Sequence, residues 1–265
     1  MDTESDVELL TEAAREAGAL ALTFFRRDPK SWAKGETSVV SEADIALDQL
    51  LAARLLTARP DYGWLSEETA EDPMQRARSR VFVVDPIDGT KGFLAGSTEW
   101  TVSLAVVEDG RPVAAALYAP ALGSMFQGVA GKGATRDGVP LRVSARAELP
   151  GANVAGSRRL VRDALELASV PLEYYGFVAS LAYRFALVAT GEVDVAIARP
   201  GAYDWDLAAA DLLVHEAGGR LAGLDGTRPR YNRQERRHPA LLAATPELSD
   251  AMAALVAMAE SRRAD

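Results

Sequence analysis

Acidic side chains gather in three short motifs of this 265-residue chain. The first, Asp85-Pro86-Ile87-Asp88-Gly89-Thr90, follows the apolar run 81–84 and places two carboxylates and a hydroxyl on a turn. The second is the pair Glu67-Glu68, and the third is Asp206, which we expect at the start of a helix. Carboxylate oxygens are the ligands that Mg2+ prefers, and a substrate phosphate commonly completes its shell. Together the motifs predict a site for a hard cation.

The turn after residue 84 also suits a phosphate group. Gly89 lets the backbone approach a ligand closely, so the N–H groups of Gly89 and Thr90 can bind phosphoryl oxygens beside the metal. Pro86 lacks an N–H, which predicts that the strand ends before it. Taken alone, this motif also fits an acidic surface turn, and Asp206 alone fits a helix cap. The prediction of a metal site therefore depends on all three motifs.

In order and spacing, the motifs resemble the signatures of the inositol monophosphatase superfamily over nearly the whole chain; the third is Trp205-Asp206 leading into Glu216-Ala217-Gly218-Gly219. The resemblance implies a layered α/β/α/β/α sandwich and a phosphatase with two or three Mg2+ ions, with Mn2+ as a substitute and Li+ as an inhibitor. The metal ligands that it implies are Glu67, Asp85, the main-chain carbonyl of Ile87, Asp88 and Asp206.

The same resemblance implies roles in catalysis. Asp44 pairs with Thr90 to position and deprotonate the attacking water, and Glu67 is counted among the catalytic residues as well as the metal ligands. Glu68 serves as a partial or outer ligand. Metal ions in such a site lower the pKa of a bound water and steady the leaving oxygen, so that no covalent phosphoenzyme is needed.

Two other classes compete with this interpretation. Phosphatases of the haloacid dehalogenase type also carry an Asp-rich motif after an apolar strand, but one residue separates their two aspartates. Two residues separate Asp85 from Asp88, and only the i, i+2 spacing leaves both side chains on one face of an extended strand. The other class is a catalytically idle metal-binding or regulatory protein that keeps the fold. The complete set of acidic residues argues against it.

Local sequence favours a bisphosphorylated nucleotide as the substrate. Gly156-Ser157-Arg158 resembles an element near the second phosphate in 3'(2'),5'-bisphosphate nucleotidases of the CysQ type. Arg199 stands where inositol monophosphatases carry a Glu, and its guanidinium suits a second phosphate better than a polyol. Segment 187–191 is equally similar to inositol monophosphatases, so inositol 1-phosphate and histidinol phosphate stay open as substrates. The predicted substrate contacts are Gly89, Thr90, Ser157, Arg158, Arg199 and Asp206.

Composition narrows the partners. The net charge is −9 and the longest Lys/Arg run is a pair, so the sequence has no basic patch that would bind long nucleic acids. The chain has no cysteine, so disulfides and thiolate metal sites are excluded. The acidic N-terminus and the lack of an apolar run of about 20 residues predict a cytoplasmic protein without membrane insertion. The expected partner is a small phosphorylated metabolite, and a homodimer stays open.

Hydrophobic periodicity predicts two halves. Residues 1–148 form an α+β half, in which two helices cover a mainly antiparallel sheet that carries most metal ligands. The first helix spans about residues 6–27, and the second runs from Ser41, whose hydroxyl can cap it, to Pro60. Residues 149–265 form an α/β half that contributes Asp206 and substrate contacts. We expect residues 28–40 to be a polar loop. The other predicted elements are strands at 62–66, 81–84, 100–107, 113–119, 124–129 and 193–198, and helices at 181–190 and 207–217.

Overall fold

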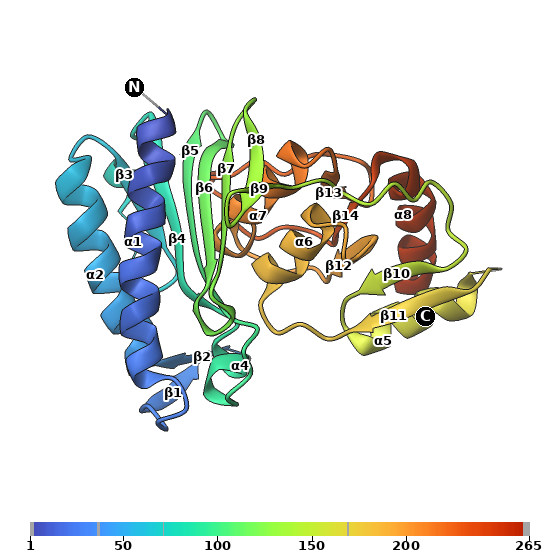
Figure 1. Ribbon diagram of the computed structural model, residues 1–265, viewed down its shortest axis with the longest axis horizontal. Helices are drawn as coiled ribbons and strands as arrows, with labels where there is room; N and C mark the ends of the chain where they lie inside the picture. Colours follow the sequence, from blue (N-terminus) through green and yellow to red (C-terminus); the bar gives the residue numbers. More distant parts are fainter. Residues whose placement is uncertain (1–2, 36–37, 71, 169, 262–265) are drawn as a thin grey trace.

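The computed structural model describes residues 3–35, 38–70, 72–168 and 170–261, and within them helices and sheets alternate in layers (Figure 1). Helices α1 and α2 pack on one face of a seven-stranded sheet, α6 and α7 lie between that sheet and a five-stranded one, and α5 and α8 cover the far side. This confirms the predicted α/β/α/β/α sandwich. The helices of these layers are α1 (Thr3–Phe24), α2 (Glu42–Ala58), α5 (Arg158–Leu167), α6 (Leu181–Ala189), α7 (Asp204–Glu216) and α8 (Pro246–Ser261). The chain also forms a short helix, α3 (Pro73–Arg76).

The larger sheet has the order β3-β4-β5-β6-β7-β8-β9, with β3 and β4 parallel and the other neighbours antiparallel. Ser66, the last residue of β3, lies opposite Val84 of β4. The residues that follow, Glu67 and Asp85, are therefore brought side by side at one edge. The strands are β3 (Gly63–Ser66), β4 (Arg80–Asp88), β5 (Thr101–Glu108), β6 (Arg111–Ala119), β7 (Ser124–Val129), β8 (Gly133–Arg136) and β9 (Val139–Pro140).

The smaller sheet has the order β11-β10-β12-β14-β13 and lies wholly after residue 148. The predicted division at that residue falls between the two sheets, but an apolar core that includes Phe126, Phe185 and Leu213 joins them. The division into two halves stays a prediction. The strands are β10 (Ala152–Ala155), β11 (Leu172–Gly176), β12 (Val195–Ala198), β13 (Arg220–Gly223) and β14 (Leu241–Ala244).

Helix α7 explains why the strands of the larger sheet read as continuous apolar runs. It packs on the face opposite to α1 and α2, against β4, β5, β6 and β7. Because both faces are covered, every residue of β4 is buried. The sequence pattern alone predicts helices on only one face of this sheet. None of the helices in the described residues is long and apolar enough to cross a membrane.

The predicted end of the strand at residue 84 is wrong. β4 continues through Pro86 to Asp88, with an irregular register between Asp85 and Asp88, and Asp88 lies opposite Thr101. At a bulge of this kind no ladder hydrogen bond is required from the proline nitrogen, so Pro86 is tolerated. The bulge also changes the direction of the side chains around it. A short helix, α4 (Thr90–Leu94), follows at once.

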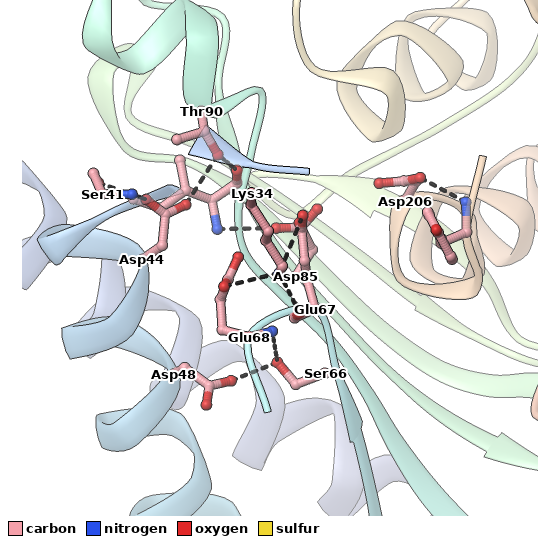
Figure 2. A network of polar contacts seen from close by, with 12 residues as sticks. Lys34, Ser41, Asp44, Asp48, Ser66, Glu67, Glu68, Asp85, Thr90 and Asp206 are labelled. Atoms are coloured by element: carbon pink, nitrogen blue, oxygen red, sulfur yellow. Dashed lines mark hydrogen bonds and ion pairs between the residues drawn. The ribbon is translucent and has the colours of Figure 1, made fainter. Parts of the chain in front are cut away.

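The predicted loop over residues 28–40 is also wrong in part. It contains an antiparallel hairpin of β1 (Ser31–Lys34) and β2 (Ser38–Ser41), whereas residues 36–37 lie outside the described residues. Every residue of β1 is exposed, so its sequence lacks the alternation of apolar and polar residues that marks a half-buried strand. It places Lys34 beside the carboxylate pair Glu67-Glu68 (Figure 2).

A buried ion network fixes the opposite ends of the elements that carry the site. Asp6 of α1 accepts hydrogen bonds from Arg59 Nε at 3.0 Å, Arg80 Nη1 at 2.8 Å and Tyr62 Oη at 2.9 Å. Arg59 ends α2, Tyr62 precedes β3 and Arg80 begins β4. The Asp6 carboxylate thus ties together α1, the end of α2 and the starts of β3 and β4, and the other ends of α2, β3 and β4 carry acidic residues of the predicted site.

Candidate active site

Three carboxylates from distant parts of the chain converge at the edge of the larger sheet (Figure 2). Glu67 follows β3, Asp85 lies on β4 and Asp206 is in the first turn of α7. One oxygen from each lies within 4.8 Å of the others. All donors in this group are carboxylate oxygens, which fits a hard divalent cation such as Mg2+.

Local hydrogen bonds orient these carboxylates. Asp85 Oδ1 accepts from the Ile87 N–H at 3.0 Å, and Asp206 Oδ2 accepts from the Tyr203 N–H at 2.7 Å. The second contact is a capping interaction at the N-terminus of α7, where partial positive charge favours an anion. Both aspartates are therefore held in place by the backbone around them, and each keeps oxygens that can coordinate a cation.

Lys34 is a cation that the fold itself brings to this group. Its Nζ lies 3.8 Å from a carboxylate oxygen of Glu67 and 2.9 Å from Glu68 Oε2, and it donates to the Glu67 carbonyl at 2.6 Å. Glu68 is thus paired with Lys34 at the side of the cluster, as expected of an outer carboxylate. Its role as an outer ligand stays a prediction.

The pair expected to activate water is formed. Thr90 Oγ1 lies 2.9 Å from Asp44 Oδ1 and 2.9 Å from the carbonyl oxygen of Ile87. Asp44 Oδ2 accepts from both the N–H and the hydroxyl of Ser41, which caps α2 as predicted. The contact to Ile87 shows that its carbonyl faces the same side as the Thr90 hydroxyl.

Asp88 stands apart from the three convergent carboxylates. Its Oδ2 accepts from the Ser180 hydroxyl and from the Ala182 N–H at 2.7 Å, and its Oδ1 from the Leu181 N–H at 3.2 Å. It therefore caps α6 and joins β4 to the second half of the chain. A carboxylate has about four lone-pair sites, so this role is compatible with metal coordination, which stays a prediction for Asp88.

The three convergent carboxylates, Asp88 and Thr90 border one cavity of ≈ 470 Å³. Gly89 has a φ of 93°, and a Cβ at this position would lie 3.0 Å from the Ser180 nitrogen, so the close approach of α6 requires glycine. No sequence motif signals Ser180, Glu99 or Phe177, and Glu99 and Phe177 form part of the cavity wall. The lining includes Glu67, Asp85, Ile87, Asp88, Gly89, Thr90, Glu99, Phe177 and Asp206.

The three residues that were expected to contact a second phosphate lie elsewhere. Ser157 caps α5, where its Oγ accepts from the Leu160 N–H at 3.4 Å. Arg158 begins that helix and Arg199 follows β12, and both are exposed. None of the three borders the cavity. Their contact with substrate stays a prediction without support from this arrangement.

Burial and mutual repulsion raise the pKa of every carboxyl in the centre. Burial is the largest cause for Glu67, whose pKa rises to about 7, and the charge of Glu68 is the next. The pKa values of Asp85 and Asp206 lie well above the usual range, because burial is reinforced by Glu67 and Asp88 respectively. Burial also raises the pKa of Asp44, against the hydrogen bonds from Ser41. A bound divalent cation would offset both the burial and the mutual repulsion of these charged carboxylates.

The model of the inositol monophosphatase family matches residues 2–261. The chain belongs to the inositol monophosphatase family. The family match and the phosphatases among its relatives identify a phosphoric monoester hydrolase. A solved structure of this family, the Thermotoga maritima IMPase, has a TM-score of 0.85 with 24% identity and covers 98% of each chain, which supports the fold.

Relatives of the chain carry several names. A Mycobacterium tuberculosis histidinol-phosphatase is 37% identical over 73% of this chain and 77% of its own length. A Mesorhizobium japonicum inositol-1-monophosphatase is 35% identical over 73% and 75%, and an Aggregatibacter actinomycetemcomitans 3'(2'),5'-bisphosphate nucleotidase CysQ is 28% identical over 84% and 86%. A Streptomyces griseus protein named glucose-1-phosphate thymidylyltransferase is 36% identical over 85% and 88%. Identity alone does not select a substrate.

The raised pKa values predict how pH and Mg2+ affect stability. A folded pKa of about 7 for Glu67, against 4.5 for a free side chain, means that a destabilising charge is fully present above pH 7 and is relieved as the pH falls toward 4.5. We expect the Tm of metal-free protein to rise from pH 8 to pH 6, and Mg2+ to raise the Tm more at pH 8, because protons compete with the cation. Thermal denaturation with EDTA or Mg2+ measures both effects.

Glu67→Gln is the control for this prediction, because it removes the titrating group and leaves His215 and His238 in place. Both the rise in Tm toward pH 6 and the pH dependence of the Mg2+ effect should become smaller in this variant. A metal-free Tm that falls from pH 8 to pH 6 in the wild type would contradict the assignment.

Proposed function

We propose that the chain is a Mg2+-dependent phosphomonoesterase that hydrolyses a small phosphorylated metabolite by attack of water. The supporting observation is that Thr90, which is hydrogen-bonded to Asp44, borders the same cavity as the three convergent carboxylates. When bound, Mg2+ would acidify a water molecule and neutralise phosphoryl charge. The residues that would hold it are Glu67, Asp85, the Ile87 carbonyl, Asp88 and Asp206.

The side chains of the cavity have separate tasks in this proposal. Thr90 Oγ1 donates its proton to Asp44 and so turns its lone pairs toward the attacking water, whose proton passes through the hydroxyl to Asp44. The raised pKa of Asp44 makes it a stronger base than an exposed aspartate. The N–H groups at the start of α4, from Gly89 and Thr90, would bind the phosphoryl oxygens on which negative charge builds.

We favour a nucleoside 3',5'-bisphosphate as the substrate, so that the product is a nucleoside monophosphate and phosphate. The support comes from the sequence, because Arg199 stands where inositol monophosphatases carry a Glu, although Arg199 itself lies outside the cavity. Inositol 1-phosphate and histidinol phosphate are the alternatives, and relatives with those names are 35% and 37% identical to the chain. Mn2+ is expected to replace Mg2+, and Li+ to inhibit. An idle metal-binding protein is the alternative from another class.

Substitution of the water-activating pair tests the catalytic proposal. Asp44→Asn removes the proton acceptor and should lower kcat by about 10²- to 10⁴-fold, with a smaller effect on KM. Thr90→Ala should also lower kcat, whereas Thr90→Ser keeps the hydroxyl and should retain most activity. Phosphate release measures the rates, and unchanged melting temperatures establish that the variants are folded. Wild-type kcat in Asp44→Asn would exclude this role for Asp44.

A direct comparison of substrates tests the specificity. Adenosine 3',5'-bisphosphate, inositol 1-phosphate and histidinol phosphate are supplied separately with Mg2+, and kcat/KM is compared. We expect a preference for the bisphosphate of about 100-fold, which corresponds to about 2.7 kcal/mol. A preference for either of the other two would keep the mechanism and reject the nucleotide, and no phosphate release from any substrate would favour the idle protein.

A further inference from the structure

A second cavity adjoins the metal-binding carboxylates. It has a volume of ≈ 650 Å³ and shares Glu67 with the first cavity. Cationic and aromatic side chains meet in its wall, which is unexpected in a chain of net charge −9. The wall includes Lys34, Tyr203, Trp205, Arg236 and Arg237.

Backbone pairing fixes the two arginines relative to the metal centre. Tyr203 and Arg237 form an isolated antiparallel bridge. Next to it, Gly201 N–H donates to the His238 carbonyl at 2.9 Å, and His238 N–H donates to the Ala202 carbonyl at 2.8 Å. The segment before α7 is thereby paired with the arginine segment, and α7 is the helix that carries the metal-binding aspartate.

Aromatic rings hold the guanidinium groups. Arg237 Nε donates to Tyr203 Oη at 2.8 Å, and its guanidinium carbon lies 5.1 Å from the centroid of that ring. The guanidinium carbon of Arg236 lies 5.9 Å from the Trp205 ring, and the two rings stack with centroids 4.7 Å apart and planes 8° from parallel. Such packing pre-organises arginine, so that less side-chain entropy is lost when it binds an anion.

We propose that Arg236 and Arg237 form a second anion subsite, which binds a phosphate group of the substrate other than the one that is hydrolysed. This inference rests on the proposed function, and it replaces Arg158 and Arg199, which border neither cavity. Guanidinium groups match the oxygens of phosphate, and a substrate with one phosphate at the metal centre would reach the subsite past Ser38 and Glu67, the two residues that the cavities share.

Two nucleotides that differ only in the second phosphate test the subsite. For wild-type protein with Mg2+, kcat/KM for adenosine 3',5'-bisphosphate should exceed that for adenosine 3'-monophosphate. In R236Q/R237Q this ratio should fall about 10- to 100-fold, as expected for the loss of hydrogen bonds to a charged group. A ratio that is near one in the wild type, or unchanged in the variant, overturns the proposal.

R230Q/R233Q is the matched control. It removes two positive charges from the same segment, but neither residue borders the second cavity, and Arg230 donates to the carbonyl of Asp109. R230Q/R233Q should keep the wild-type ratio of kcat/KM for the two nucleotides. If the ratio falls as far in R230Q/R233Q as in R236Q/R237Q, the preference reflects only the overall charge of the segment, and the subsite proposal is overturned. R158Q/R199Q tests the alternative location of the second phosphate. If only this variant loses the preference for the bisphosphate, the second phosphate binds at Arg158 and Arg199, and the proposal is overturned.

A binding measurement keeps this inference apart from the proposed function. Adenosine 5'-monophosphate carries only the phosphate assigned to the subsite, and its affinity for metal-free protein is measured by calorimetry in EDTA. It should bind more weakly to R236Q/R237Q than to wild type or R230Q/R233Q, whether or not any nucleotide is hydrolysed. Equal affinities overturn the subsite, whereas absence of phosphate release with these differences intact contradicts only the proposed reaction.

Discussion

Three carboxylates that meet within 4.8 Å in a largely buried place repel one another and lose hydration, and both effects oppose their ionisation. Among the described residues, Lys34 is the cation that offsets this repulsion, and its ion pairs are with Glu67 and Glu68 only. The carboxylate cluster therefore lowers the stability of the folded protein when no metal ion is bound. A divalent cation converts the same repulsion into binding energy. The rest of the structure holds the carboxylates together in spite of their charge.

Helix N-termini supply part of the compensation. Asp44 lies in the first turn of α2, Asp206 lies in the first turn of α7, and Asp88 accepts two N–H groups at the start of α6. The partial positive charge at these ends favours an anion at each position. The parallel pair β3 and β4 adds Glu67 and Asp85 at one edge. The larger sheet and three helix N-termini thus hold these acidic groups near one another, while the Asp6 network fixes α2, β3 and β4 at their far ends.

The sequence predicted what depends on local pattern. The Ser41 cap, the helical periodicity around it and the acidic motifs next to apolar runs are local, and they led to the family and to the layered fold. The bulge at Pro86 was missed because the rule that proline ends a ladder is correct on average, while neighbours on both faces stabilise β4 beyond it. The capping of α6 by Asp88 and the bridge between Tyr203 and Arg237 join residues far apart in the chain, and no local pattern signals them.

The assignment of a second phosphate site shows the same limit. Arg158 and Arg199 stand out by their position relative to motifs, but both are exposed outside the cavities, whereas tertiary pairing brings Arg236 and Arg237 to the wall of the second cavity. The motifs identify the family because the three convergent carboxylates lie within or next to them. In the account proposed here, specificity depends on residues that approach from other parts of the chain.

The most direct test of the account is a Mg2+ titration of phosphate release by EDTA-treated protein, with Asp85→Asn beside the wild type. The account predicts no release without metal, activity that saturates with Mg2+ in the wild type, and a much higher Mg2+ requirement or no activity in the variant. Phosphate release at the full rate without any divalent cation would contradict the claim that these carboxylates form the metal centre of a phosphatase.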